Sequence, residues 1–284
     1  MISMSGKAIR KWWALFALPT FAAFIIGFVV PFIMGVYLSF TRFHAVTDSK
    51  FIGIRNYVKA FKDPHFLHSL MFTIAFTVVT TVLINVIAFA IAYMLTKKFS
   101  GSNVFRTVFF MPNLIGGIVL GYVWQLVLNG ILAYFGRSIT YSAVYGFWGL
   151  VLLICWQQIG YMMIIYIAGL QALPGDVIEA AAVDGATPMQ TLFKITIPLM
   201  MPSITVCTFL TVTNGFKLFD QNLALTNGMP SHKSEMLALN IFNTFYGRTN
   251  GEGVGQAKAV VFFVIVAVIA LIQNMLTRSK EVVA

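Results

Sequence analysis

The segment EAAAVDGATPMQTLFKITIP, Glu179–Pro198, differs in character from the sequence around it. It gathers acidic residues, alanines, a glycine and residues that cap helices, whereas the chain of 284 residues is 59% hydrophobic and only 10% charged. A chain of that composition keeps most of its length in apolar surroundings. The segment therefore predicts a short, polar, turn-rich structure outside those surroundings.

The residues before and inside this segment predict a first short helix. Pro174 and Gly175 should end the preceding helix, because proline lacks an amide hydrogen and glycine enters turns freely. Asp176 can then act as the N-cap, with Glu179 three residues later reaching back in a capping box. We expect this helix to run to Val183.

A glycine turn should separate this helix from a second one. Gly185 suits the left-handed conformation that often ends a helix. Thr187 as N-cap, Pro188 at the first helical position and Gln190 at the third then start the next helix.

The alanines of the first helix, Ala180, Ala181 and Ala182, give it a surface of low relief. A groove of another protein can approach such a backbone closely, as in helix-in-groove recognition. The simpler interpretation is a well-capped loop with no partner, since capping patterns are common. The residues by themselves leave both alternatives open.

Long apolar runs surround the segment and place the chain among polytopic membrane proteins. The mean hydropathy is +0.85 and 15% of the residues are aromatic, which is outside the range of soluble domains. A bilayer core needs about 20 mostly apolar residues in helical form, because backbone amides in lipid must bond within their own segment. Six stretches approach that length: 12–40, 67–95, 104–128, 146–170, 200–221 and 257–276. We predict an all-α protein with six transmembrane helices.

The basic residues predict the orientation of these spans. An even number of spans places both termini on one side, and the bases of the short loops favour the cytoplasm for that side. Lys7, Arg10 and Lys11 precede the first apolar run, which is too long for a signal peptide, so we expect a retained span. Bases also crowd the first loop on the opposite side, so the contrast between the two sides is small.

The longer connections carry most of the polar sequence. Residues 41–66 contain the spaced aromatics and bases of an interfacial amphipathic helix, and residues 222–256 contain turn and loop residues. Both should lie on the outer side, whereas the connection 171–200 holds the opening segment and should lie on the side of the termini. We expect one membrane domain over residues 1–284.

Several function classes are excluded by what the sequence lacks. The net charge of +10 comes from bases beside apolar spans, where they meet lipid headgroups, so we expect no nucleic-acid partner. The sequence has no G-x-x-x-x-G-K-[ST] nucleotide loop and no H-E-x-x-H pair. Cys155 and Cys207 lie in separate apolar segments, and the histidines, scattered over the outer loops, are His44, His65, His68 and His232. We expect no metal, no cofactor and no enzymatic activity in this chain itself.

The spacing within the opening segment resembles the hallmark of the inner-membrane permease subunits of binding-protein-dependent ABC importers. That hallmark reads approximately EAA, two residues, DGA, then a phenylalanine and an I-x-LP segment. The matching positions are Glu179-Ala180-Ala181, Asp184-Gly185-Ala186, Phe193 and Ile195-Thr196-Ile197-Pro198, with Ile197 in place of leucine. The many matches at fixed spacing favour membership of that family.

The resemblance extends over nearly the whole chain and is similar to the carbohydrate-uptake branch of the family. YLSFTRF and FIGIRNYVKAFKDPHF resemble its entry to the second span, FRTVFFMPNLIGGIVLGYVWQLVLN its third span, and FKLFDQNLALTNGMP its exit from the fifth. Met229 departs from the pattern, because the family usually has a second glycine before the proline.

The resemblance implies a type I ABC importer permease fold, with six transmembrane helices and a cytoplasmic coupling helix, in a bacterial or archaeal cytoplasmic membrane. It implies a heterodimer with a second homologous permease, two cytoplasmic ATPase subunits that bind ATP and magnesium, and an extracytoplasmic solute-binding protein that delivers a mono- or oligosaccharide. The residues expected to couple to an ATPase subunit are Glu179, Ala180, Ala181, Asp184, Gly185 and Ala186. A short rigid helix there can transmit a rigid-body movement of the ATPases to the spans.

Polar and aromatic side chains at the depth of the spans are candidates for the sugar path, because sugars pair hydroxyls with amides and C–H faces with aromatic rings. The candidates are Asn85, Asn113, Gln125, Trp156, Gln157, Tyr161, Asn214, Lys217, Asp220 and Gln221, with Trp124, Gln158 and Thr213 beside them. In the fifth span the residues Thr213, Lys217, Asp220 and Gln221 recur at helical spacing, with Asn214 adjoining, and predict one polar face.

Each candidate has an alternative role. A hydrogen bond between helices is commoner for a polar residue in a span. Lys217 and Asp220 would otherwise form a pair that snorkels to the outer interface. Gly117 and Gly121 form a G-x-x-x-G step, which we assign to helix packing.

Other functions fit the sequence less well. A secondary transporter would need buried carboxylates on broken helices, and the spans nearly lack Asp and Glu. A membrane-embedded enzyme would need a nucleophile and a base, for which no constellation is present. The same importer architecture with another solute, such as a glycerol phosphodiester or a polyol, stays open at this point.

Overall fold

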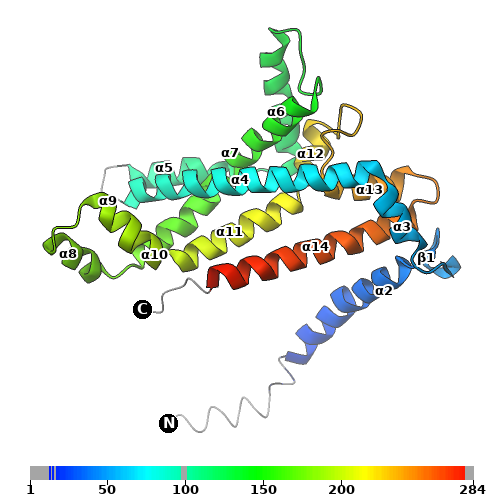
Figure 1. Cartoon of the computed structure of the whole chain (residues 1–284), viewed down its shortest axis with the longest axis horizontal. Coiled ribbons are helices and arrows are strands. Elements are labelled where there is room, and N and C mark those ends of the chain that lie inside the picture. Colours follow the sequence, from blue (N-terminus) through cyan, green and yellow to red (C-terminus); the bar gives the residue numbers. More distant parts are fainter. Residues whose placement is uncertain (1–12, 14, 16, 97–100, 279–284) are drawn as a thin grey trace. The chain divides into compact units, whose positions relative to one another are not determined.

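The computed structural model describes residues 13, 15, 17–96 and 101–278, which are mostly helical (Figure 1). Lys7, Arg10 and Lys11, which supported the predicted orientation, lie outside these residues. The described residues form two compact units. One contains those up to Lys62 together with Ile241–Val261, and the other contains Asp63–Asn240 together with those from Phe262 onward.

The first unit contains the first apolar helix and a small β-hairpin. Its elements are η1 (Ile25–Val29), α2 (Val30–Leu38), β1 (Thr41–Arg42), η2 (Val46–Asp48), β2 (Lys50–Phe51), α3 (Arg55–Lys62), the second part of α13 (Leu237–Gly247) and the first part of α14 (Glu252–Arg278). The strands pair antiparallel, with Thr41 opposite Phe51. The amphipathic helix predicted within residues 41–66 is present as α3, whereas the sequence pattern did not indicate the hairpin.

A buried asparagine of α3 holds the hairpin to that helix, and the start of α14 packs closely beside it. Asn56 Nδ2 donates hydrogen bonds to the carbonyl oxygens of Ser39 (2.9 Å) and Thr41 (2.7 Å). A Cβ on Gly253 would lie 2.7 Å from the same nitrogen, so the close approach of α14 requires glycine at that position.

The second unit is a helical bundle. Its elements are α4 (Pro64–Thr96), α5 (Ser102–Phe110), η3 (Met111–Leu114), α6 (Gly117–Ala133), α7 (Ala143–Gln171), α8 (Gly175–Val183), α9 (Pro188–Thr191), η4 (Leu192–Thr196), α10 (Ile197–Leu199), α11 (Met201–Phe216), α12 (Asp220–Leu225), the first part of α13 and the rest of α14. α4, α7 and α11 lie side by side in Figure 1, and apolar side chains such as Phe76, Leu153 and Met162 are buried in their core. A long unbroken α7 thus packs at the centre of this unit.

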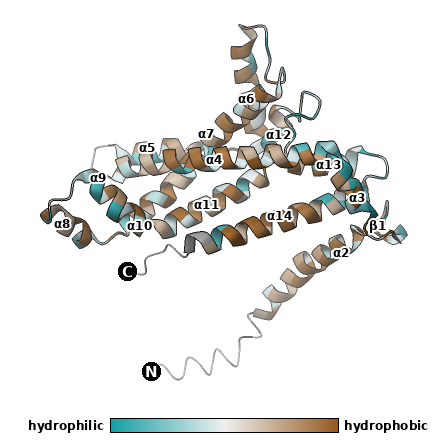
Figure 2. Cartoon of the chain, viewed as in Figure 1, coloured by the Kyte–Doolittle hydropathy of each residue, from teal (hydrophilic) through white to brown (hydrophobic). Residues whose placement is uncertain are grey.

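Hydrophobic residues run along α2, α4 and α14, whereas hydrophilic residues gather on α3 (Figure 2). Four described helices are long and apolar enough to cross a membrane, namely Ala17–Leu38, Pro64–Thr96, Ala143–Gln171 and Glu252–Met275. Two bent pairs meet the same criteria, Ser102–Leu114 with Gly117–Ala133 at 101° and Pro188–Leu199 with Met201–Phe216 at 68°. The predicted all-α polytopic fold is confirmed, with up to six spans when each bent pair is one span.

The third and fifth spans are not the continuous helices that the sequence predicted. Within 104–128 the helix breaks because Ile115 and Gly116 are both extended. Within 200–221 α11 ends at Phe216, and α12 begins only at Asp220.

The connection 222–256 is also more ordered than its turn residues indicated. It contains most of α12, all of α13 and the start of α14. The segments LTNGMP and GRTNGEGVG had dominated the prediction of a loop, and they flank α13 rather than replace it.

Candidate functional site

The opening segment of the sequence forms two short helices after α7. α8 begins at Gly175, and the extended residue Pro174 is its N-cap. The prediction that Asp176 caps this helix is wrong, because Asp176 already lies inside the first turn. Its carboxylate accepts a hydrogen bond from the backbone N–H of Val177 (3.0 Å), and no capping box with Glu179 forms. The Asp176 carboxylate still stabilises α8, because it lies near the positive, N-terminal end of the helix dipole.

The motif residues at the end of α8 form a Schellman turn. The backbone N–H of Ala186 donates to the carbonyl oxygen of Ala181 (2.9 Å), and that of Gly185 donates to the carbonyl oxygen of Ala182 (3.2 Å). Gly185 has φ +81°, as the sequence predicted, and Ala181 is buried with 7% exposure. The spacing between EAA and DGA therefore sets where α8 ends and how the chain leaves it.

The second helix starts as predicted. Thr187 and Gln190 form a capping box, in which the backbone N–H of Thr187 donates to Gln190 Oε1 (2.8 Å) and that of Gln190 donates to Thr187 Oγ1 (3.3 Å). The π-helical η4 and the short α10 follow α9, and a 68° bend then leads into α11. The loop from α7 to α11 is thus built of capped helical turns.

α8 and α9 leave apolar side chains uncovered. Val183 is 87% exposed, and Val177, Ile178 and Met189 are exposed as well. Uncovered apolar side chains on a capped helix offer a surface to another protein. The six predicted coupling residues all lie on this helix or its terminal turn; they are Glu179, Ala180, Ala181, Asp184, Gly185 and Ala186.

Four of the predicted path residues form two pairs at the middle of α7. Gln157 Nε2 donates to the carbonyl oxygen of Ile115 (3.2 Å), and Gln157 Oε1 accepts from Gln221 Nε2 (2.9 Å). Asn214 Nδ2 donates to Gln158 Oε1 over a longer distance of 3.4 Å. In both pairs the amides bond one helix to another.

The G-x-x-x-G step lies where α6 packs against α12. A Cβ on Gly117 would lie 2.8 Å from Cβ of Asp220, and a Cβ on Gly121 would lie 2.6 Å from Cβ of Ala224. The two helices approach this closely only because both positions lack a side chain. The predicted packing role of the two glycines is confirmed.

Two other predicted path residues also bond helices together. Gln125 Nε2 on α6 donates to the carbonyl oxygen of Leu225 on α12 (2.9 Å). Asn85 on α4 accepts a hydrogen bond from the Tyr166 hydroxyl (2.6 Å) and donates to Thr211 Oγ1 (3.0 Å). Asn85 also lines a cavity of about 520 Å³, together with residues of η4.

The remaining candidates lie on or next to the broken third span and α7. The rings of Trp124 and Trp156 stand edge to face with centroids 5.6 Å apart, and Trp156 remains exposed. Tyr161 is half-buried on α7, and Asn113 is half-buried in η3.

The predicted polar face of the fifth span is wrong. α11 ends at Phe216, so Thr213 and Asp220 belong to different helices. Thr213 is buried and donates to the carbonyl oxygen of Phe209 in its own helix (2.8 Å). Lys217 and Asp220, both within the described ranges, are exposed and form no ion pair with each other.

Asn222, which was not among the predicted site residues, is fully buried on α12. Its Nδ2 donates to the carbonyl oxygen of Ser234 (2.8 Å) and to Thr226 Oγ1 (3.0 Å), and its Oδ1 accepts from the backbone N–H of Met236 (2.9 Å). A lone asparagine just before the apolar LAL run and the TNGMP turn residues was the signal for such a side-chain bond to the turn.

Two histidines that lie far apart in the sequence come together. The rings of His65 and His232 have centroids 5.1 Å apart, and His232 Nδ1 lies 3.3 Å from Glu235 Oε1. Within residues 17–96 and 101–278, no group of three or more His, Cys, Asp or Glu side chains is arranged to hold a metal ion.

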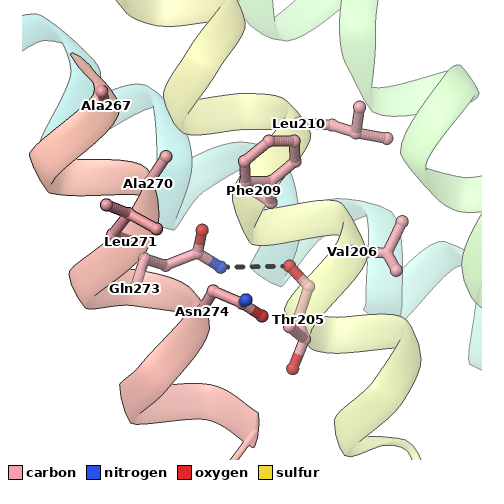
Figure 3. Close-up of a pocket in the computed structure, with 9 residues that line it drawn as sticks. All are labelled: Thr205, Val206, Phe209, Leu210, Ala267, Ala270, Leu271, Gln273 and Asn274. Carbon is pink, nitrogen blue, oxygen red and sulfur yellow. Dashed lines mark hydrogen bonds between the residues drawn. The ribbon is translucent and has the colours of Figure 1, made fainter.

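A cavity of about 760 Å³ lies between α11 and α14 (Figure 3). The amide of Gln273 donates to the backbone carbonyl oxygen of Thr205 (3.1 Å), as the dashed line in Figure 3 shows. The rest of its lining is mostly apolar, with Val206, Phe209, Leu210, Ala267, Ala270, Leu271 and Asn274. None of the predicted path residues lines this cavity.

The motif at α8 and the spans around it match a known family. A model of the family described as binding-protein-dependent transport system inner membrane component matches residues 95–282. The chain belongs to this family. The predicted family is thus confirmed, and the motif Glu179–Ala186 falls inside the matched region.

The permease is similar to sugar-system proteins over nearly its full length. It is 41% identical over 280 residues to the probable starch degradation products transport system permease protein AmyD of Thermoanaerobacterium thermosulfurigenes, covering 95% of each chain. It is 29% identical over 287 residues to the multiple sugar-binding transport system permease protein MsmF of Streptococcus mutans, covering 97% of this chain and 99% of that protein.

The fold of the permease also matches a solved structure. The crystal structure of a bacterial alginate ABC transporter, in complex with an alginate pentasaccharide-bound periplasmic protein, superimposes with a TM-score of 0.80. The identity is 20%, and the match covers 97% of each chain. The predicted type I ABC importer permease fold is therefore confirmed.

Proposed function

We propose that the permease is the transmembrane subunit of an ATP-driven sugar importer and forms half of the solute path. The family, the apolar spans and the similarity to two permeases of sugar transport systems support this assignment. The permease itself carries no ATPase activity in this proposal, because hydrolysis belongs to separate subunits that bind ATP and magnesium.

The observation that carries the proposal is the rigid, apolar-surfaced α8. The Schellman turn at Gly185 and the capping box at Thr187 fix both sides of the glycine turn. Val177, Ile178 and Val183 are exposed on α8, and a groove on an ATPase subunit would cover them. A helix held in this way passes a rigid-body movement to α7 and α11, whereas a flexible loop would absorb it.

The proposed assembly contains a second homologous permease, two cytoplasmic ATPase subunits and an extracytoplasmic solute-binding protein. The similar alginate transporter is in complex with a sugar-bound periplasmic protein, which supports the last of these partners. The assembly lies in a bacterial or archaeal cytoplasmic membrane, with both termini and α8 in the cytoplasm. The outer loops 41–66 and 222–256 would then face the solute-binding protein.

We further propose that the sugar passes the side chains left free of helix-to-helix bonds. Trp156 is exposed beside Trp124 and offers an aromatic face, and the exposed Lys217 and Asp220 flank the break after α11. Tyr161 and Asn113 are half-buried and complete the candidate path.

Uptake in proteoliposomes tests the function directly. The permease is co-purified with the proteins encoded by the neighbouring genes and reconstituted into liposomes that contain ATP. Solute-binding protein and a labelled oligosaccharide are then added outside. We expect ATP-dependent accumulation of the sugar, and Asp220→Ala should lower it at unchanged protein content. Uptake that is independent of ATP would contradict the proposal.

A second solute class is kept as an arm of the same experiment. A labelled glycerol phosphodiester or polyol replaces the oligosaccharide under identical conditions. An excess of unlabelled oligosaccharide is then added as a competitor to each assay. In a sugar importer it abolishes uptake of the labelled oligosaccharide only, which distinguishes the two solute classes. ATP-driven uptake of the phosphodiester alone would leave the architecture in place and overturn the assignment of a sugar.

A further inference from the structure

Gln157 is the point at which one unbroken helix meets two broken spans. The third span breaks at the extended residues Ile115 and Gly116, and the fifth breaks between Phe216 and Asp220. α7 passes both breaks as one helix from Ala143 to Gln171. Backbone groups released by a break inside a membrane need partners, which neighbouring helices supply.

The side-chain amide of Gln157 bonds to both breaks with its two halves. Its Nε2 donates to the carbonyl oxygen of Ile115, the residue at the first break, over 3.2 Å. Its Oε1 accepts from Nε2 of Gln221, in the first turn after the second break, over 2.9 Å. Gln157 is buried, with 7% exposure, so water competes little for these bonds.

The helices that follow the two breaks are packed into one body. Gly117 and Gly121 of α6 lie against Asp220 and Ala224 of α12 without room for a Cβ. Gln125 adds a hydrogen bond from α6 to α12 one turn further on. α6 and α12 therefore form a pair whose starts are both bonded to α7 through a single side chain.

α7 also leads to α8. About 21 Å of unbroken helix separates Gln157 from Gln171, where α7 ends, and α8 begins four residues later at Gly175. A displacement of α8 thus reaches Gln157 through three connecting residues, 172–174, and then through one unbroken helix.

We propose that Gln157 is a positioning residue that ties both breaks to α7, so that α6 and α12 follow α7 as one body when α8 moves. This rests on the proposed function, because the movement of α8 is supplied by an ATPase subunit. Gln157 then acts through Ile115 and Gln221 and is not a contact for sugar.

Gln157→Met tests this, because methionine keeps the length of the side chain and removes both bonds. Gln273→Met is the matched control. It removes a bond of the same kind, from a glutamine amide to a backbone carbonyl oxygen over 3.1 Å, between α14 and α11 and away from both breaks. Gln221→Met removes only the bond from Gln221 Nε2 to Gln157 Oε1. It is the replacement test variant if Gln157→Met fails to fold.

The first readout is the number of ATP molecules hydrolysed for each sugar transported by the complete complex. We expect Gln157→Met to raise this ratio about ninefold and Gln221→Met about threefold, taking roughly threefold for each bond between helices. Gln273→Met should keep the wild-type ratio. A general loss of folded protein would lower uptake and hydrolysis together and leave the ratio unchanged.

The second readout is the distance between nitroxide labels at two exposed leucines, Leu126 on α6 and Leu152 on α7, in a variant with Cys155→Ala and Cys207→Ala. Wild-type complexes should give the same distance with and without ATP and vanadate, because α6 follows α7. Gln157→Met should shift or broaden it when ATP and vanadate are added. A distance that stays fixed in Gln157→Met would overturn the proposal, whether or not the ratio changes.

The two proposals fail in different ways. A wild-type complex without ATP-dependent uptake would refute the importer function before the variants are compared. A wild-type complex that transports normally, with Gln157→Met indistinguishable from Gln273→Met in both readouts, would refute only the role of Gln157.

Discussion

The backbone N–H of Ala186 donates a 2.9 Å hydrogen bond to the carbonyl oxygen of Ala181 across the left-handed turn at Gly185. This bond closes the end of α8 and directs the chain into the capping box of α9. The direction in which α8 points is therefore set by local backbone geometry.

Replacing Gly185 by alanine should disturb this geometry. The left-handed conformation costs a residue with a Cβ about 1 kcal/mol, which shifts the equilibrium of the turn roughly fivefold. We expect less uptake for each ATP hydrolysed by Gly185→Ala at unchanged membrane abundance. Gly185→Asn is the control, because asparagine tolerates the left-handed region and should retain more coupling. Equal coupling in both variants and the wild type would show that the turn does not matter.

An acidic side chain at Val183 should prevent assembly with the ATPase. Val183 is 87% exposed in the chain alone, so Val183→Asp should change the free energy of unfolding of the isolated permease by no more than about 0.5 kcal/mol. In the complex it would bury a charge, so co-purification of the ATPase subunits should be lost. Val46→Asp, at an exposed valine of η2, is the control and should assemble normally. Normal assembly of Val183→Asp would remove α8 from the interface.

Asn222→Ala should destabilise the second unit. The variant leaves the carbonyl oxygen of Ser234 and the backbone N–H of Met236 without the partner that Asn222 supplies, at about 1–3 kcal/mol for each group. We expect a lower unfolding temperature in detergent. Asn103→Ala, at an exposed asparagine, should leave the temperature unchanged. Equal unfolding temperatures for the two variants would contradict the role given to Asn222.

The loop around η2 should open at low pH. Hydrogen bonds from the backbone N–H groups of Ala45 and His44 hold the pKa of the Asp48 carboxyl below its usual value. Because the folded pKa is the lower one, this stabilisation is present above the pKa of the unfolded chain and is lost as the pH falls through the folded value. Hydrogen exchange should show protection of the Ala45 and His44 amides that fades in that range. In Asp48→Asn the protection should no longer depend on pH there, and a profile like that of the wild type would exclude Asp48 as the cause.

The features that the sequence predicted correctly are those that neighbouring residues determine. Gly185 and the Thr187–Gln190 capping box depend on contacts three to five residues apart, and both are found. The N-cap at Asp176 was misplaced by two residues, because Pro174 and Gly175 enter the helix earlier than the capping pattern indicated. The apolar runs predicted the positions of the spans, because the length and composition of a segment are also properties of neighbouring residues.

The features that the sequence could not predict depend on partners far along the chain. Gln157 bonds to residues 42 and 64 positions away, so its spacing carried no sign of either contact. The breaks at Ile115 and after Phe216 lie inside apolar stretches that read as continuous helices. Several candidates for the sugar path, among them Asn85 and Gln125, form bonds between helices, which is the alternative role that the sequence left open for them.

A photo-crosslinker in place of Glu179, which is exposed on α8, tests the proposed role of α8 as a cytoplasmic lever seated on an ATPase subunit. In assembled, transport-competent complexes in inverted membrane vesicles, we expect an adduct between this position and the ATPase subunit. An adduct to the solute-binding protein, or labelling of a cysteine at position 179 by a membrane-impermeant reagent added outside intact cells, would contradict it.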